Sequence, residues 1–199
     1  GQRNLRSDRQ MMSPTEIAGF ALGLVMVVCS IRELHWSWPL AISSSILYFF
    51  VFKNSLLYGE AALQLVFVAL ALWGWWQWLR MDDADQPILV IQRLSRRGWA
   101  WVSVTSMALW PALALLLEQF TDSDVAWWDA LPTALSLVGQ ALLGRKYIEN
   151  WLVWLVVNMI SVVLFAYKGL WLTCLLYALF TLMSVWGWRA WKTRMKARA

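Results

Sequence analysis

Apolar stretches long enough to cross a bilayer recur along the chain, and they restrict it to one class of fold. Crossing about 30 Å of hydrocarbon takes about 20 mainly apolar residues in a helix. Runs such as Ala62–Trp73 show no alternation in polarity, so they do not fit the short alternating strands of a membrane barrel. With 60% hydrophobic residues, too little polar surface remains to cover a soluble domain of 199 residues. We therefore predict an all-α integral membrane protein.

The apolar stretches divide into seven predicted transmembrane helices. They cover residues 15–34, 38–53, 57–79, 99–120, 126–143, 149–168 and 170–191. Most of the 17 tryptophans lie near the ends of these segments, as in interfacial belts. The one long connection, residues 80–98, mixes acidic residues, a proline and arginines, which indicates a loop between two groups of three helices.

The distribution of Lys and Arg predicts the orientation in the membrane. Twelve of the 17 basic residues fall on the side that holds residues 80–98 and the C-terminus. The other five are Arg3, Arg6, Arg9, Lys53 and Lys168. Because cytoplasmic loops carry the excess of basic residues, we predict a cytoplasmic C-terminus and an external N-terminus. Topology thus accounts for the net charge of +5, and we expect no nucleic-acid partner.

The two halves of the chain carry an internal repeat. Sliding the sequence by 113 positions, without a gap, places the WGWxxW motif that begins at Trp73 on the one that begins at Trp186. The same offset pairs Arg32 with Arg145, Trp38 with Trp151, and Phe67 with Phe180. An offset that contains four spans leaves both copies facing the same way. We predict parallel three-helix repeats at 15–79 and 126–191, joined by the loop 80–98 and a linker helix at 99–120.

Polar side chains within the spans are the candidate site residues, because they are costly in lipid and usually face a cavity or a partner. Trp151, Trp154, Asn158 and Ser161 share one helix face, and the repeat maps it onto Trp38, Ala41, Ser45 and Tyr48. Gln64 and Tyr177 occupy equivalent positions in spans 3 and 7, and Asp129, Thr133, Ser136 and Gln140 form a stripe in span 5. The shared depth of Ser45, Gln64, Asn158 and Tyr177 favours a site near the midplane between the repeats.

Structural readings compete with these functional ones. Trp151 fits an interfacial belt as well as a pocket, and Asn158 fits a bond to a neighbouring helix. The Ser and Thr residues fit close helix packing, Tyr48 and Tyr177 fit either role, and we interpret the WGWxxW motifs as interface anchors. No catalytic, metal or cofactor site is expected, since the single His35 lies in a short loop and Cys29 and Cys174 lack metal-ligand spacing.

From Pro14 to Lys192 the chain resembles the PnuC-type vitamin transporters. The residues that carry the resemblance are Trp151, Trp154 and Asn158 after Arg145-Lys146-Tyr147, Trp38-Pro39, Leu57-Tyr58 with Gln64, and the Gly-Trp closures of spans 3 and 7. The chain departs from the family pattern at Leu40-Ala41, which follows Trp38-Pro39, where a glycine is common. The resemblance implies a 3+1+3 arrangement of parallel repeats, similar to the SWEET sugar transporters, in the bacterial inner membrane, and a homotrimer. It also implies uptake of nicotinamide riboside by facilitated diffusion, with the solute trapped by phosphorylation inside the cell.

A flat cationic pyridinium and a hydroxyl-rich ribose would suit aromatic faces paired with amides. We expect Trp151 and Trp154 to stack on the ring, where cation–π attraction contributes about 2 kcal/mol or more. Asn158, Gln64 and Gln140 would bond the carboxamide and ribose, and Tyr177 would do either. Tyr48 and Ser45 complete the predicted substrate site, and Lys146 and Asn150 are gate candidates at the cytoplasmic end. A thiamine or riboflavin carrier, a SWEET-like sugar carrier and a non-transporting receptor or assembly module remain alternatives.

Overall fold

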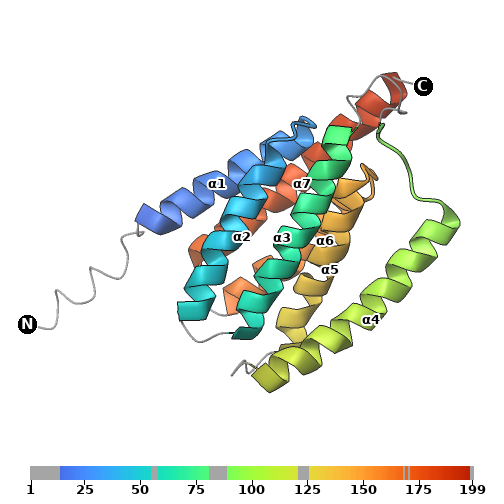
Figure 1. Ribbon diagram of the computed structural model, residues 1–199. Helices are drawn as coiled ribbons and strands as arrows, with labels where there is room; N and C mark the ends of the chain where they lie inside the picture. The colour runs from blue at the N-terminus through green and yellow to red at the C-terminus, as the bar shows by residue number, and fades with distance from the viewer. Residues whose placement is uncertain are drawn as a thin grey trace, which may run out of the picture.

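Seven α-helices make up the described part of the computed structural model, which covers residues 14–54, 58–80, 89–120, 126–167, 169 and 171–197 (Figure 1). The helices are α1 (Pro14–Ile31), α2 (Ser37–Asn54), α3 (Tyr58–Leu79), α4 (Arg96–Phe120), α5 (Ala126–Gly144), α6 (Asn150–Tyr167) and α7 (Trp171–Ala197). The prediction of an all-α fold with seven helices is confirmed. Observed and predicted bounds agree within three residues, except that α7 continues six residues beyond its predicted end at 191.

Three of the described helices are long and apolar enough to cross a membrane by length and composition. Their apolar stretches are Ala61–Leu79, Arg96–Phe120 and Asn150–Tyr167. Less than a fifth of the windows in α3 and α4 is buried within the protein, so these helices turn most of their apolar surface outward, as lipid contact requires. Several residues used above lie outside the described residues: Arg3, Arg6, Arg9, Leu57, Lys168 and residues 81–88 of the 80–98 connection.

Six of the helices form a closed ring. α1 packs against α2 and α7, α3 packs against α2 and α5, and α6 packs against α5 and α7. The fourth helix, α4, packs mainly on α5 and lies outside the ring (Figure 1). The first helix of each half of the chain therefore packs on the third helix of the other half, as α1 does on α7 and α5 does on α3.

The turns that follow α1 and α5 have the same backbone conformation. Glu33 and Lys146 both adopt left-handed φ values, 59° and 52°, which are rare for residues other than glycine. In each turn the next N–H donates to the carbonyl five residues back, Leu34 to Cys29 at 2.8 Å and Tyr147 to Leu142 at 3.0 Å. This is the Schellman pattern that closes a helix C-terminus. Both turns lie at the same end of the bundle as the last turns of α3 and α7, which we call the C-terminal end (Figure 1).

The glycines of the two WGWxxW motifs provide space for tryptophan rings from the neighbouring helix. The ring of Trp38 lies on Gly74, and the ring of Trp151 lies on Gly187, where a Cβ would lie 2.5 to 2.6 Å from three ring atoms. The last tryptophan of each motif then meets the same ring edge-to-face. Ring centroids are 5.4 Å apart for Trp38 and Trp78, and 5.5 Å apart for Trp151 and Trp191. Aromatic pairs prefer this geometry over a face-to-face sandwich.

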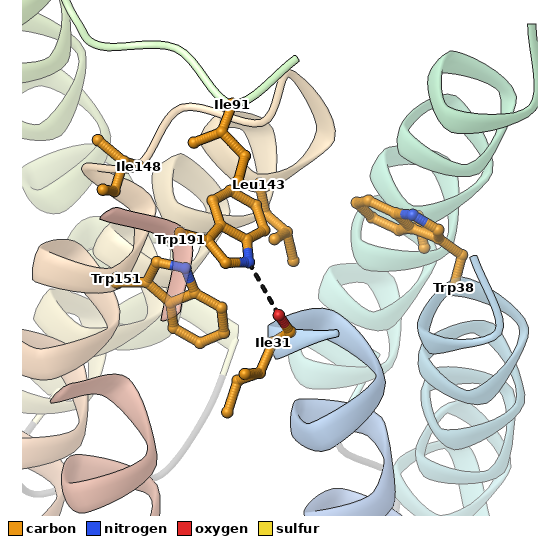
Figure 2. Close-up of a cluster of buried hydrophobic side chains, with 8 residues drawn as sticks. Ile31, Trp38, Ile91, Leu143, Ile148, Trp151 and Trp191 are labelled. Atoms are coloured by element: carbon orange, nitrogen blue, oxygen red, sulfur yellow. Dashed lines mark hydrogen bonds between the residues drawn. The ribbon is translucent and has the colours of Figure 1, made fainter. Parts of the chain in front are cut away.

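The interpretation of these motifs as interface anchors is wrong for Trp191. Trp191 is 0% exposed, and its Nε1 donates to the carbonyl of Ile31 at 3.1 Å (Figure 2). Trp78 is half-buried, and its Nε1 donates to the carbonyl of Leu143 at 3.3 Å. The last carbonyls of a helix lack partners within it, so each indole satisfies a helix end that belongs to the other half of the chain.

The segment 89–95, inside the predicted loop, closes over the C-terminal end of the bundle. The N–H of Gln92 donates to the carbonyl of Lys146 at 3.1 Å, and its carbonyl accepts from the N–H of Ile148 at 2.9 Å. The side chain of Ile91 is 4% exposed and belongs to the same buried cluster as Ile148 and Trp191 (Figure 2). This part of the connection is therefore packed into the protein.

Candidate functional site

A cavity of about 320 Å³ lies within the six-helix ring. This volume is at the lower end of the range for sites that hold small molecules. Every helix of the ring contributes lining residues: Met26, Val27 and Ser30 from α1; Ser37, Trp38, Ala41, Ser44 and Ser45 from α2; Gln64 and Phe67 from α3; Gln140 and Leu143 from α5; Trp151, Trp154 and Asn158 from α6; Tyr177, Phe180 and Ser184 from α7. Both halves of the chain thus enclose one cavity.

Trp154 provides an aromatic surface in this cavity. Its indole lies against the backbone of α5 at Gly139, where a Cβ would come within 3.2 Å of Cε2 and 3.3 Å of Nε1. The ring is half-buried, whereas Trp151, one turn earlier on α6, is 2% exposed and lies between Gly187 and Trp191. Of the two tryptophans, Trp154 therefore has more surface left for a ligand.

Amide side chains reach the cavity from three different helices. Asn158 is 5% exposed, and its Nδ2 donates to Oγ of Ser184 at 3.1 Å. That hydroxyl donates in turn to the carbonyl of Phe180 at 2.8 Å, which fixes the orientation of the pair. Gln64 on α3 and Gln140 on α5 are half-buried lining residues. A ligand in the cavity would meet both donors and acceptors beside an aromatic face.

The C-terminal end of the cavity is sealed by buried side chains. Trp38 and Ser37 are 1% and 2% exposed, and Ile31, Ile148 and Trp191 pack in the same layer (Figure 2). Nε1 of Trp38, Nε1 of Trp151 and Oγ of Ser37 have no hydrogen-bond partner within the described residues. Unpaired buried donors cost free energy, so this layer is dense but incompletely hydrogen-bonded.

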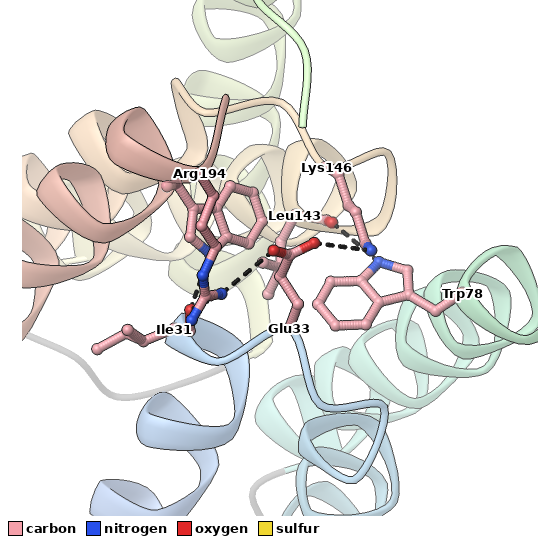
Figure 3. A network of polar contacts seen from close by, with 7 residues as sticks. Ile31, Glu33, Trp78, Leu143, Lys146 and Arg194 are labelled. Carbon is pink, nitrogen blue, oxygen red and sulfur yellow. Dashed lines mark hydrogen bonds and ion pairs between the residues drawn. The ribbon is translucent and has the colours of Figure 1, made fainter. Parts of the chain in front are cut away.

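An ionic network joins the two halves at this sealed end. The carboxylate of Glu33 accepts from Nζ of Lys146 at 3.0 Å and from Nη1 of Arg194 at 3.2 Å (Figure 3). Arg194 also donates to the carbonyl of Ile31 at 2.9 Å, and Nζ of Lys146 lies 4.8 Å from the centroid of a Trp78 ring. The Glu33 and Lys146 side chains are only 9% and 14% exposed, so this pair is screened less by solvent than a surface ion pair, whereas the Arg194 side chain is 36% exposed.

The structure brings most of the predicted substrate residues to one cavity. Those that line it are Trp151, Trp154, Asn158, Gln64, Gln140, Tyr177 and Ser45. Tyr48 is not among the lining residues and is 49% exposed, because it lies one turn beyond Ser45 on α2. Of the gate candidates, Lys146 belongs to the ionic network, whereas Asn150 is fully buried and its Nδ2 donates to the carbonyl of Tyr147 at 2.6 Å.

Several hydroxyls within the helices bond the preceding turn of their own helix. Thr133 donates to the carbonyl of Asp129 at 2.9 Å, and Ser136 donates to that of Pro132 at 2.7 Å. In α7, Thr181 donates to the carbonyl of Tyr177 at 2.8 Å. Such bonds to the preceding turn satisfy a hydroxyl without any ligand. Only Gln140 of the α5 stripe reaches the cavity.

Sequence reasoning did not select several lining residues. They are Met26, Val27, Ser30, Ser37, Ser44, Phe67, Leu143 and Phe180. The 113-residue offset could have found Ser37, because it pairs this residue with the gate candidate Asn150. It also pairs Glu33 with Lys146, which would have pointed to the ionic network.

The described lining residues carry no Asp, Glu, Lys, Arg or His side chain. Within the described parts of the chain, no group of three or more His, Cys, Asp or Glu residues could hold a metal ion. The two cysteines of the chain are unpaired and half-buried. The chemistry available in the cavity is therefore aromatic stacking together with neutral hydrogen bonding.

Comparisons with known proteins relate the chain to transporters of vitamins and nucleotides. A family model described as nicotinamide mononucleotide transporter matches residues 13–193. The chain is 28% identical to the nicotinamide riboside transporter PnuC of Escherichia coli over 94% of its own length and 88% of that protein. It is 30% identical to the riboflavin/roseoflavin transporter RibM of Streptomyces davaonensis over 92% and 86% of the two chains. The fold is similar to the crystal structure of the vitamin B3 transporter PnuC, with a TM-score of 0.71, 24% identity, and coverage of 91% of this chain and 81% of that one.

Proposed function

The chain belongs to the nicotinamide mononucleotide transporter family, and we propose that it takes up nicotinamide riboside by facilitated diffusion. It is a multi-pass protein of the bacterial inner membrane. The proposal depends above all on one observation: a cavity enclosed by helices from both halves presents the face of Trp154 beside the amides of Asn158, Gln64 and Gln140. Its relatives in Escherichia coli and Haemophilus influenzae are nicotinamide riboside transporters.

Trp154 is the proposed partner of the pyridinium ring. The ring is flat and cationic, and a tryptophan face in a desolvated site attracts a cation by about 2 kcal/mol or more. Trp151 offers the ring less surface, because its own indole is held between Gly187 and Trp191. Asn158, Gln64 and Gln140 are the proposed partners of the carboxamide and ribose, and Tyr177 and Ser45 complete the site.

The neutral lining supports a nucleoside as the solute over a nucleotide. A phosphate monoester carries a charge of about −1.5 to −2 at neutral pH and is usually bound by Arg, Lys or backbone N–H groups. The described lining residues include no basic side chain to balance such a charge. They also include no carboxylate that could couple transport to protons. The proposed carrier therefore moves the solute down its concentration gradient, and phosphorylation inside the cell traps it.

The proposed mechanism is alternating access between two parallel three-helix repeats, residues 15–79 and 126–191, in a 3+1+3 arrangement similar to the SWEET transporters. Residues 80–98 form the cytoplasmic loop and 99–120 the linker helix. The matching turns at Glu33 and Lys146, and the matching ring pairs on Gly74 and Gly187, support this division. The C-terminus is proposed to be cytoplasmic, the N-terminus external, and the assembly a homotrimer. The ionic network then closes the cytoplasmic end, with Lys146 as a gate residue.

Riboflavin is the second candidate solute, because the relative in Streptomyces davaonensis carries it. Binding to purified protein in detergent distinguishes the candidates. Nicotinamide riboside, nicotinamide mononucleotide, thiamine, riboflavin and glucose are titrated while tryptophan fluorescence is followed. We expect saturable binding of nicotinamide riboside alone. Absence of a response to it would overturn the proposal, and saturation by riboflavin instead would establish the second candidate.

A further inference from the structure

The two halves of the chain line the cavity with side chains of different size, and the repeat offset identifies the positions that differ. The offset of 113 residues pairs Trp154 with Ala41 and Gly139 with Met26. In the second half a large residue on α6 lies over a glycine on α5. In the first half a small residue on α2 accompanies a long one on α1, and both line the cavity.

In the second half, the indole of Trp154 packs closely against α5. Its ring lies 3.2 to 3.3 Å from the position that a Cβ on Gly139 would take, so any larger residue there would have to displace the ring. The equivalent position on α1 carries Met26, an unbranched side chain that adapts to irregular surfaces. Ala41 adds only a methyl group where its counterpart carries a whole indole.

The remaining lining pairs differ less in volume. Trp38 and Trp151 are identical, as are Phe67 and Phe180, and Gln64 and Tyr177 are both large, whereas Ser30 and Leu143 differ in size by less than Ala41 and Trp154 do. The exchanges of Ala41 for Trp154 and of Met26 for Gly139 are therefore the largest differences in side-chain size between the halves at the cavity, and both first-half residues line it.

We propose that Ala41 and Met26 form the wall that determines which flat ring enters beside Trp154, so that they are the specificity-determining residues of this carrier. The inference rests on the proposed transport of a flat-ring vitamin. Ala41 sets the clearance through its small size, and Met26 adapts to the ring edge. In this proposal a single-ring pyridinium fits the space beside Ala41 and Met26, and a fused three-ring system requires smaller side chains at these two positions.

Binding to purified variants tests the proposal. Ala41→Leu narrows the cavity and should weaken nicotinamide riboside binding by about tenfold or more, since one or two methylenes in an apolar pocket change affinity by that factor or greater. Ser43→Leu adds a comparable side chain to an exposed position two residues away on α2 and should bind like the wild type. Equal affinities of Ala41→Leu and Ser43→Leu would overturn the proposal.

Variants that enlarge the cavity give a second readout and add no side-chain volume to the core. Ala41→Gly and Met26→Ala should raise the affinity for riboflavin relative to nicotinamide riboside, with both proteins monodisperse by size-exclusion chromatography. An unchanged ratio in both would overturn the proposal, even if Ala41→Leu fails to fold. If the wild type binds riboflavin and not nicotinamide riboside, the proposed solute is wrong, yet Ala41→Leu should still weaken riboflavin binding. If it binds neither, both proposals fail.

Discussion

Glu33 and Lys146 occupy the same position in the two halves of the chain, 113 residues apart, and their side chains form an ion pair of 3.0 Å. Both residues have left-handed backbones that close equivalent helices. In the proposed arrangement of parallel repeats, a residue that contacts its own counterpart lies near the axis that relates the two copies. This ion pair therefore lies where the halves must separate if the sealed end is to open.

Neutralising Glu33 should loosen this end. Glu33→Gln removes the charge that holds both Lys146 and Arg194, and a loss of about 1.4 kcal/mol for the closed arrangement would raise the open population about tenfold. A cysteine introduced at the lining residue Ser30, with Cys29 and Cys174 replaced by alanine, reports the opening. Its alkylation by a membrane-impermeant maleimide in inside-out vesicles should accelerate by about that factor.

The control for this experiment is Glu118→Gln on α4. Its carboxylate accepts from Nε1 of Trp127 at 2.7 Å and lies outside the ionic network. It should leave the labelling rate unchanged. Equal rates in Glu33→Gln and the parent cysteine variant would show that the network does not restrict access.

Adding a methyl group at Gly187 should destabilise the protein. The new Cβ would lie 2.5 to 2.6 Å from atoms of the Trp151 ring, and overpacking of this kind costs about 1–3 kcal/mol. Gly139→Ala is the graded comparison, because its Cβ would lie 3.2 to 3.4 Å from its nearest neighbours. Thermal unfolding followed by tryptophan fluorescence should give a lower Tm for Gly187→Ala than for Gly139→Ala. The reverse order would contradict the packing described here.

Helical periodicity and the repeat offset predicted much of the arrangement. The i, i+3, i+7 spacing put Trp151, Trp154 and Asn158 on one helix face, and all three line the cavity. The same rule failed on α2, where Tyr48 lies one turn beyond Ser45 and does not line the cavity. Periodicity assigns a side chain to a face of its helix, but it does not define how far along the axis the cavity extends.

Other features depend on contacts that no local pattern reveals. A tryptophan at a helix end reads the same in sequence whether it lies at the membrane interface, as the half-exposed Trp186 can, or in a buried layer, as Trp191 does. A Thr or Ser in an apolar span fits either a site or close helix packing, and Thr133 and Ser136 bond the turn before them. The pairing of Glu33 with Arg194 requires the α1–α2 turn and the end of α7 to meet, and this is decided by tertiary packing.

Truncating Trp154 should weaken binding of nicotinamide riboside without unfolding the protein. Loss of a cation–π contact of about 2 kcal/mol corresponds to roughly 30-fold in Kd. Trp154→Phe keeps a smaller aromatic face and should lie between the wild type and Trp154→Ala. The measurement is calorimetric titration of monodisperse protein. Wild-type affinity in Trp154→Ala would remove this residue from the site.

Asn158→Ala should abolish measurable binding because it removes the amide proposed to bond the carboxamide and ribose, which in the protein alone donates to Ser184. A structural role for the pair predicts a different outcome, and Ser184→Ala separates the two. That variant removes the interhelical bond and leaves the amide, so its affinity should fall only a few-fold, in line with the modest average strength of such bonds, about 0.6 kcal/mol. Equal losses in Asn158→Ala and Ser184→Ala would assign Asn158 to helix packing.

Replacing Trp191 by phenylalanine tests whether the two halves are joined through indole hydrogen bonds. The substitution keeps an aromatic ring against Trp151 and removes the donor to the carbonyl of Ile31, so we expect a loss of about 0.5–1.5 kcal/mol in stability. Trp78→Phe removes the reciprocal donor to Leu143, at 3.3 Å instead of 3.1 Å, and should cost less. Trp186→Phe, five residues earlier on α7 and 49% exposed, is the matched control and should leave Tm unchanged. If Trp186→Phe lowered Tm as much as Trp191→Phe, the effect would belong to indole size and not to the bond between the halves.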